Sequence, residues 1–347
     1  MPVVIPAGEL GSFVTALLGA SVPNPDHART ISDVLLWASL RGVDSHGVAR
    51  VPRYLELLDS GEANAAPAMS FAGGPSGVTV LDADRAPGPV ALTAAADEAV
   101  RRARAAGIGA VGVRRTVHTG AIGYYTARIA GQGLIGIAFV AGMPQMPYPG
   151  SPGAAVATSP LSIAVPSGGD APVVLDMATA GIALGKIAQY RNAGRTLPEG
   201  VAATADGIPT TDPQLAKMPL PLGGAKGAGM SLAFELITSV LVGAPIVSSF
   251  HSGDPAGRKH RQNALIVALD PAAFGDPALF VEQVSATLTA LHGLPKSDPD
   301  TAIRYPGENS AAVAESRSAK GIPVGPKVWA ELEVAAEKLG VALPIPI

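Results

Sequence analysis

The sequence contains no cysteine among its 347 residues, which excludes disulfide bonds, thiolate metal sites and a cysteine nucleophile. Aromatic residues make up only 4% of the chain, although 48% of it is hydrophobic, so we expect a core of alanine, valine, leucine and isoleucine. No run of about 18 apolar residues occurs, and the amino terminus lacks a basic region followed by an apolar stretch. We therefore expect a cytoplasmic protein with no membrane span and no signal peptide.

Basic segments are also missing. The formal net charge is −3 and no lysine- or arginine-rich run occurs, whereas a nucleic-acid-binding domain usually presents a basic face. The histidines outside the two clusters described below lie among polar or loop residues, where we expect them at the surface, and their spacing predicts no metal site. They are His27, His251, His260 and His292. A small molecule, rather than nucleic acid or a membrane, is the expected partner.

Hydrophobic periodicity predicts helical ends and a mixed α/β middle, and the length allows two or three core-forming units. The expected helices are 10–18, 26–40, 51–58, 92–106, 230–241 and 328–339, and the expected strands are 78–81, 108–113, 134–140, 162–165, 173–175 and 264–269.

Two G-x-G-x-x-G matches occur in the middle region, beginning at Gly107 and at Gly131. A dinucleotide fingerprint follows a strand and opens a helix, so that the helix amino terminus faces the pyrophosphate. Both matches here are expected to end a helix and open a strand. We therefore interpret them as helix caps rather than as a Rossmann motif.

The densest group of reactive side chains lies in the segment 44–54, which contains Ser45, His46, Arg50 and Tyr54. A guanidinium can hold a carboxylate through two parallel hydrogen bonds, and an imidazole can exchange a proton near neutral pH. These are the groups needed to bind a small organic acid. A helix-end cap with one solvated arginine is the alternative that the residues leave open.

Further candidates follow predicted strands. His118 lies between a buried strand and the helix of Tyr124 and Tyr125, where catalytic groups are common, although a structural histidine is the alternative. Asp176 ends an apolar run and either serves the site or caps the next helix. Lys226, within a glycine-rich segment before a helix, suits a phosphate or is part of a flexible lead-in. Glu308 either meets ribose hydroxyls or belongs to a turn.

Together these segments resemble the type-2 malate/L-lactate dehydrogenase family, in order along nearly the whole chain. This family includes ureidoglycolate and sulfolactate dehydrogenases and piperideine-2-carboxylate and pyrroline-2-carboxylate reductases. The matching segments are RGVDSHGVARVPRYLELL (41–58), the region 118–125, TSPLSIAVP (158–166), VLDMATAGIALGKI (174–187), LPEGVAATADGIPTTDP (197–213), PLGGAKGAGMSLAFEL (221–236), YPGE (305–308) and GIPV (321–324).

The resemblance implies a mixed α/β fold with a non-Rossmann NAD(P)-binding domain built on a largely antiparallel central sheet. It implies that residues 76–299 form this cofactor-binding domain. Residues 1–75 and 300–347 would form a helical, substrate-side domain that supports a homodimer.

The resemblance also implies site roles. His118 would be the acid/base, with His46 and Arg50 as further catalytic residues, and Ser45, Arg50 and Tyr54 would bind substrate. NADH or NADPH would be the cofactor, and hydride would pass between nicotinamide and the carbon next to a carboxylate. The expected cofactor contacts are Gly120, Thr158, Asp176, Met177, Ala178, Lys226, Gly307 and Glu308.

The chain departs from the family pattern around His118. Family members usually have asparagine before and phenylalanine after this histidine, where the present chain has Val117 and Thr119. The segment 140–146 also replaces a usual polar loop. Three interpretations stay open: a 2-oxo acid/2-hydroxy acid oxidoreductase, a reductase of a cyclic imine or imino acid in a specialised biosynthetic pathway, and a catalytically degenerate binding protein.

Overall fold

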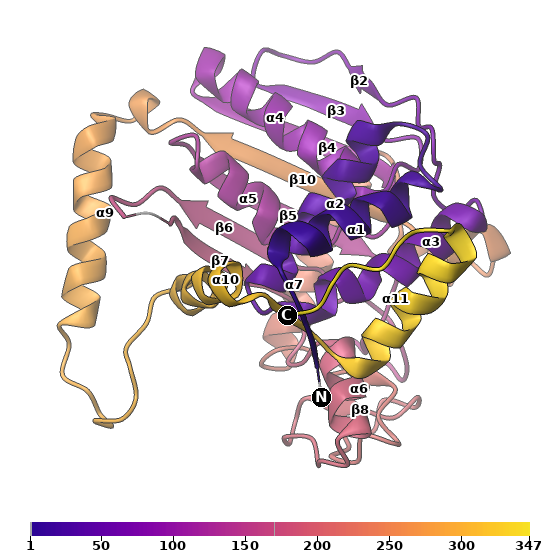
Figure 1. Cartoon of the computed structure of the whole chain (residues 1–347). Helices are drawn as coiled ribbons and strands as arrows, with labels where there is room; N and C mark the ends of the chain where they lie inside the picture. Colours follow the sequence, from indigo (N-terminus) through magenta and orange to yellow (C-terminus); the bar gives the residue numbers. More distant parts are fainter. Residues whose placement is uncertain (1, 170) are drawn as a thin grey trace.

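The computed structural model describes residues 2–169 and 171–347, and a mixed β-sheet forms its centre (Figure 1). Seven strands of the described chain form this sheet in the order β2-β3-β4-β10-β5-β6-β7. Strands β3 and β4 are parallel, and the other neighbours pair antiparallel. Their bounds are β2 Ser70–Ala72, β3 Val78–Asp82, β4 Ile108–Thr116, β5 Ile135–Gly142, β6 Leu161–Val165, β7 Val173–Met177 and β10 Gln262–Leu269.

The glycine-rich segments end helices, as the sequence predicts. Gly107 has a left-handed φ of 79° and caps α4 (Gly88–Ala106) directly before β4 begins. Gly131 follows α5 (Gly123–Ala130), and β5 begins after a short turn. Glycine suits such a cap because it has no Cβ to clash in the left-handed region. Neither segment therefore opens a helix toward a phosphate.

Helices α4 and α5 pack on the sheet and build a core of small side chains. Alanines at 91, 95, 96, 99 and 103 of α4 are buried against valines and alanines of β4, β5 and β10. Small side chains let the helices approach closely: the Cβ of any side chain at Gly109 would lie 1.9 Å from a backbone oxygen of α4. The core is thus filled by close packing of the backbones of helix and sheet, with few large aromatic side chains.

The two ends of the chain fold together. Strand β1 (Val3–Ile5) pairs antiparallel with β11 (Ile322–Val324), and Figure 1 shows α11 beside α3. One buried cluster combines apolar residues of both ends, including Phe13 and Trp329. The helices here are α1 Ala7–Gly19, α2 Pro25–Leu40, α3 Val51–Asp59, α10 Glu308–Lys320 and α11 Pro326–Leu339.

The remaining elements surround the sheet, and several have no counterpart in the predicted pattern. The helix expected at 230–241 begins earlier, as α7 (Ala225–Glu235), and continues as one π-helical turn over Leu236–Val240. Figure 1 shows α9 standing apart from the body at the left edge. Within the described ranges, no helix is long and apolar enough to cross a bilayer. The other elements are α6 Leu184–Asn192, α8 Val247–His251, α9 Pro277–His292, β8 Ala202–Ala203 and β9 Met218–Pro219.

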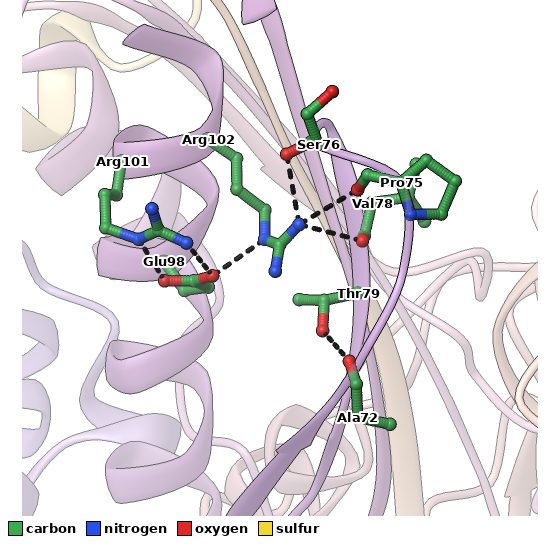
Figure 2. A network of polar contacts seen from close by, with 8 residues as sticks. All are labelled: Ala72, Pro75, Ser76, Val78, Thr79, Glu98, Arg101 and Arg102. Carbon is green, nitrogen blue, oxygen red and sulfur yellow. Dashed lines mark hydrogen bonds and ion pairs between the residues drawn. The ribbon is translucent and has the colours of Figure 1, made fainter. Parts of the chain in front are cut away.

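An arginine clamp secures the edge of the sheet farthest from β7 (Figure 2). The Arg102 guanidinium, on α4, donates to the carbonyl oxygens of Pro75, Ser76 and Val78 at 2.9–3.0 Å. Glu98, one helical turn earlier, accepts from both Arg102 and Arg101. The clamp thus ties the turn before β3 to the helix above it.

Candidate active site

The loop that carries His118 begins where the pairing of two strands is interrupted. The register between β4 and β10 shifts between Gln262 and Ala264. At this point Arg115 has a left-handed φ of 61°, and its N–H donates to the Asn263 side-chain oxygen at 2.9 Å. A bulge of this kind redirects the chain and re-aims side chains. The irregularity lies directly before the loop of His118, although Thr116 at the end of β4 still pairs with Gln262.

Hydrogen bonds from several elements fix this loop. The Thr116 hydroxyl donates to the Ala86 carbonyl at 2.8 Å, and the Thr119 N–H donates to the Gln262 side chain at 2.9 Å. The buried Tyr125 hydroxyl donates to the Thr119 carbonyl at 2.6 Å. Val117 and Thr119, where the chain departs from the family pattern, are both buried. Their side chains therefore pack in the protein interior.

Tyr54 holds the His118 ring. Its hydroxyl lies 2.9 Å from the His118 carbonyl oxygen and 3.0 Å from Nδ1 of the same residue. The single phenol proton can go to the carbonyl, and the phenol oxygen can then accept a proton from Nδ1. That arrangement leaves Nε2 free to accept a proton. Tyr54 is fully buried, so we expect it to position His118 rather than to touch the substrate.

Arg50 and His46 lie on the short 3-10 turns before α3, next to this pair. The His46 and His118 rings stack with centroids 5.8 Å apart and planes 21° apart. The Ser45 hydroxyl lies 3.1 Å from Nδ1 of His46, and Nε of Arg50 donates to the Ser45 carbonyl at 2.6 Å. Among the described residues, no carboxylate forms an ion pair with Arg50. Its terminal nitrogens can therefore receive an external anion.

The cluster lowers the pKa of its imidazoles. Burial, with the positive charge of Arg50 nearby, lowers the pKa of His46 to about 4 and holds that of His118 well below its usual value. Burial is also the main cause that lowers the pKa of Arg50. Both histidines are neutral at pH 7, and an anion bound to Arg50 would favour protonation of His118.

Strand β7, at the edge of the sheet opposite β2, carries two of the cofactor candidates, Asp176 and Met177, and contacts the segments of others. The Val174 N–H donates to the Pro306 carbonyl at 3.0 Å, which places the turn of Gly307 against the strand. Beyond the end of the strand, the Thr179 N–H donates to the Thr158 carbonyl at 3.0 Å, and the Leu222 N–H donates to the Thr179 carbonyl at 2.9 Å. Strand β7 and the residues that follow it thus form hydrogen bonds with the three segments that contain Thr158, Lys226 and Gly307.

Asp176 joins the two groups of candidates. One carboxylate oxygen accepts from the Gly123 N–H at 2.8 Å, at the first turn of α5, and Gly123 follows His118 by five residues. Desolvation by the surrounding protein raises the pKa of Asp176 to about 6, against the effect of this hydrogen bond. Asp176 therefore contacts the first turn of α5, an earlier helix. The prediction that it caps the next helix along the chain is wrong, because α6 has no side-chain cap, and the residue keeps an exposed surface.

The other cofactor candidates differ in how far they are engaged. Lys226 is exposed at the start of α7. Among the residues that the structure describes, no carboxylate forms an ion pair with it. Glu308 accepts from the Tyr305 N–H at 3.1 Å, and its carboxylate lies 3.1 Å from His292. Met177 and Ala178 are partly buried, and Ala178 packs against the buried Met146. Gly120 has a left-handed φ of 70°, and its nitrogen lies 3.3 Å from Nδ1 of His118.

The surface prediction for isolated histidines is wrong for two of them. His260 is partly buried, with Nε2 enclosed, and it lies close enough for its charge to lower the pKa of His118. His27 is also partly buried and has an enclosed Nδ1. His251 and His292 are exposed as expected. The position of His260 before β10 carried no sequence signal, because only the pairing of β10 with β4 brings it toward the site.

Known proteins give the same fold and similar sequences. The chain matches the Malate/L-lactate dehydrogenase family over residues 5–333. It is 32% identical to ureidoglycolate dehydrogenase (NAD(+)) of Escherichia coli K12 over 302 residues, 86% of each chain. It is also 32% identical to (2R)-3-sulfolactate dehydrogenase (NADP(+)) of Chromohalobacter salexigens over 311 residues, 88% of this chain and 89% of the relative.

A solved structure extends the comparison to imine chemistry. The structure of Δ1-piperideine-2-carboxylate reductase from Pseudomonas syringae pv. tomato superposes with a TM-score of 0.83 at 26% identity, covering 96% of this chain and 99% of the other. The mixed α/β fold around a central sheet and the resemblance drawn from the sequence are thereby confirmed. The chain belongs to the malate/L-lactate dehydrogenase family of NAD(P)-dependent oxidoreductases.

Proposed function

We propose that the protein transfers hydride between a nicotinamide cofactor and the carbon next to a carboxylate, interconverting a 2-oxo acid and a 2-hydroxy acid. The observation that carries the proposal is the partly buried Arg50, which has no acidic partner among the described residues and lies in one cluster with His118. An uncompensated buried charge is costly. A substrate carboxylate would supply the missing charge, with two terminal nitrogens of Arg50 available for bidentate binding.

The substrate side then works by orientation and proton transfer. Arg50 holds the carboxylate and so fixes the neighbouring carbon. Neutral His118 accepts the hydroxyl proton at Nε2 in the oxidative direction and, once protonated, returns it to the oxygen in the reductive direction. Tyr54 keeps the ring in place through Nδ1 in both states. The stacked His46 and the Ser45 hydroxyl line the same side.

The residues along β7 fit a nicotinamide dinucleotide. Thr179, directly after Ala178, has a buried hydroxyl oxygen without a hydrogen-bond partner, and Asp176 and Glu308 offer acceptors for ribose hydroxyls. Lys226 offers a positive charge for the phosphates at the start of α7. Thr158, Met177, Gly120 and Gly307 would contribute backbone and packing contacts. NADH or NADPH, when bound, supplies or accepts the hydride.

We further propose a homodimer of chains that each contain a helical domain (1–75 and 300–347) and a cofactor-binding domain (76–299). Apolar surface supports self-association: in the described chain, α9 contains no buried residue despite its many leucines, valines and alanines. Leu236, Val240 and Leu241 are also about half exposed or more. Exposed apolar surface of this extent is typical of an interface. Light scattering on the purified protein would give twice the chain mass.

A cyclic imine or imino acid is the second candidate substrate. It is supported by the likeness to Δ1-piperideine-2-carboxylate reductase and by the segment 140–146, in which Met146 is fully buried beneath Ala178. In such a substrate Arg50 would keep its role, because the carboxylate is unchanged. His118 would face the ring nitrogen instead of an oxygen.

A cofactor titration followed by a substrate screen tests the proposal. Purified protein is titrated with NADH and NADPH while nicotinamide fluorescence is followed, and 2-oxo acids and cyclic 2-imino acids are then compared by absorbance of the reduced cofactor. Saturable binding and turnover of 2-oxo acids are expected. Turnover of imino acids alone would establish the second candidate, and binding of neither cofactor would refute both and favour a binding protein.

A further inference from the structure

Arg317, on the C-terminal helix α10, reaches the segment that carries the substrate residues. Its guanidinium donates to Oδ1 of Asp44 at 2.6 Å and to Oδ2 at 3.3 Å, and it also donates to the Ser39 carbonyl at the end of α2. The Arg317 side chain is 18% exposed and that of Asp44 is 50% exposed. One side chain therefore joins residues 273 positions apart in the sequence.

The groups that Arg317 holds are the supports of the substrate cluster. Asp44 directly precedes Ser45, whose carbonyl accepts from Nε of Arg50. Ser39 contributes from its other side, because its hydroxyl accepts from the Val48 N–H at 3.0 Å. Arg317 thus contacts Asp44, which begins the first 3-10 turn, and Ser39, whose hydroxyl accepts from the residue that begins the second.

The opposite end of α10 lies at the cofactor candidates. The helix begins at Glu308, and Gly307 packs so closely against Val174 that an added Cβ would lie 2.8 Å from the Val174 nitrogen. Thirteen helical residues span about 20 Å. A single rigid element therefore connects the turn of residues 306–308 with the anchor of the substrate segment.

We propose that Arg317 is a positioning residue: by holding Asp44 and Ser39 it aims Arg50 at the substrate carboxylate, and α10 links this arrangement to the cofactor turn. The inference rests on the function proposed above. The Asp44 carboxylate is half exposed, and ion pairs with an exposed partner contribute little to global stability. Loss of the contacts of Arg317 is therefore expected to weaken substrate binding more than it destabilises the fold. Cofactor bound at the turn would then strengthen carboxylate binding, and the coupling is reciprocal.

The test compares Arg317→Met with Lys338→Met in the full-length protein. Lys338 also joins the C-terminal end to the N-terminal end, through Asp59 at 3.0 Å, but both side chains are mostly exposed. Arg317→Met should raise KM for the 2-oxo acid about tenfold, since a charge-assisted bidentate contact is lost. Its dissociation constant for reduced cofactor alone, its kcat and its Tm should stay close to wild type, and Lys338→Met should leave all four unchanged.

Two further variants and one binding measurement complete the test. Asp44→Asn should raise KM in the same direction, the double variant should add little, and Arg317→Lys should recover part of the loss. Oxalate, a non-reactive dicarboxylate probe, should bind more tightly with cofactor present in wild type and lose that gain in Arg317→Met. Equal KM values for Arg317→Met and Lys338→Met, or losses of Tm and cofactor affinity that match the rise in KM, would overturn the inference. An inactive wild type would instead refute the proposed function itself.

Discussion

The two edges of the site are built in different ways. On the substrate side, the loop of His118 is held by Tyr54, Tyr125, Gln262 and Asn263, and the groups contact one another directly. On the proposed cofactor side, Asp176 on β7 and Lys226 at the start of α7 have exposed side chains. Within the described chain, no hydrogen bond or ion pair joins the two. The first region has its geometry before any ligand binds, while the second offers separate contacts that an elongated ligand would join.

This difference fits the roles that we propose for the two regions. Proton transfer needs a donor and an acceptor within hydrogen-bond reach, so small displacements of His118 are costly and a dense network prevents them. A dinucleotide distributes its binding over many atoms, so each protein contact can be individually weak. Substitutions on the substrate side should therefore affect turnover strongly, and those on the cofactor side should mainly affect cofactor affinity.

The largest effect is expected from His118→Ala. Removing the group that accepts and returns the proton should lower kcat by about 10²–10⁴-fold, while fluorescence titration should show nearly unchanged cofactor binding. His251→Ala is the matched control, because His251 is exposed and its ring contacts the Ala155 carbonyl and the neighbouring Phe250 ring. Turnover that survives His118→Ala would remove this residue from the mechanism.

Arg50→Lys should have the next largest effect. Lysine keeps the charge but cannot form the two parallel hydrogen bonds to a carboxylate, nor reach the Ser45 carbonyl through a nitrogen at the Nε position. We expect kcat/KM for the 2-oxo acid to fall about 10–100-fold, mostly through KM. Steady-state kinetics at fixed cofactor measures this, and an unchanged KM would contradict carboxylate binding by Arg50.

The pH dependence of the two directions should separate because the pKa of His118 is lowered. Reduction needs the protonated ring, so its kcat/KM should rise about tenfold for each unit by which pH falls toward the lowered pKa. Oxidation needs the neutral ring and should be insensitive to His118 between pH 6.5 and 8. Initial rates in both directions test this, and a loss of oxidation centred near pH 6.5 would show an unshifted histidine.

The sequence predicts the substrate side better than its surroundings. Ser45, His46 and Arg50 are close in the chain, so local spacing is enough to group them, and periodicity identifies helix 92–106 and most strands. His260 and Arg317 cannot be found in this way, because the β4–β10 pairing and the packing of α10 bring them to the site from distant positions. Tyr54 lies beside His118, as its place in the sequence cluster predicts, but its complete burial could not be foreseen; this burial is the reason we propose a positioning role instead of the predicted substrate contact.

A smaller effect is expected on the cofactor side, from titration of Asp176. Its pKa is raised to about 6, so the carboxylate is ionised above this value and becomes protonated below it. A ribose hydroxyl donates more strongly to the ionised form, and cofactor affinity should fall a few-fold as pH decreases from 7 to 5. Asp176→Asn should flatten this dependence in a fluorescence titration, and an unaltered pH profile would exclude the carboxylate as its origin.

The smallest effect on catalysis is expected from the clamp at the far edge of the sheet (Figure 2). Arg102→Met removes three hydrogen bonds to carbonyl groups and one ion pair from a side chain that is only 12% exposed, so the free energy of unfolding should decrease by about 2 kcal/mol. Arg101→Met removes a contact to the same Glu98 from an exposed side chain and should change stability little. Denaturant unfolding measures both.

The kinetics of Arg102→Met test the comparison between the two edges of the site. If the variant also raised KM or lowered kcat, a dense hydrogen-bond network would influence catalysis wherever it lies in the fold, and the contrast between the substrate side and the cofactor side would not explain the effects of substitutions. If Arg102→Met lowers stability but leaves kcat and KM unchanged, the network around His118 matters for catalysis because of its position beside the substrate.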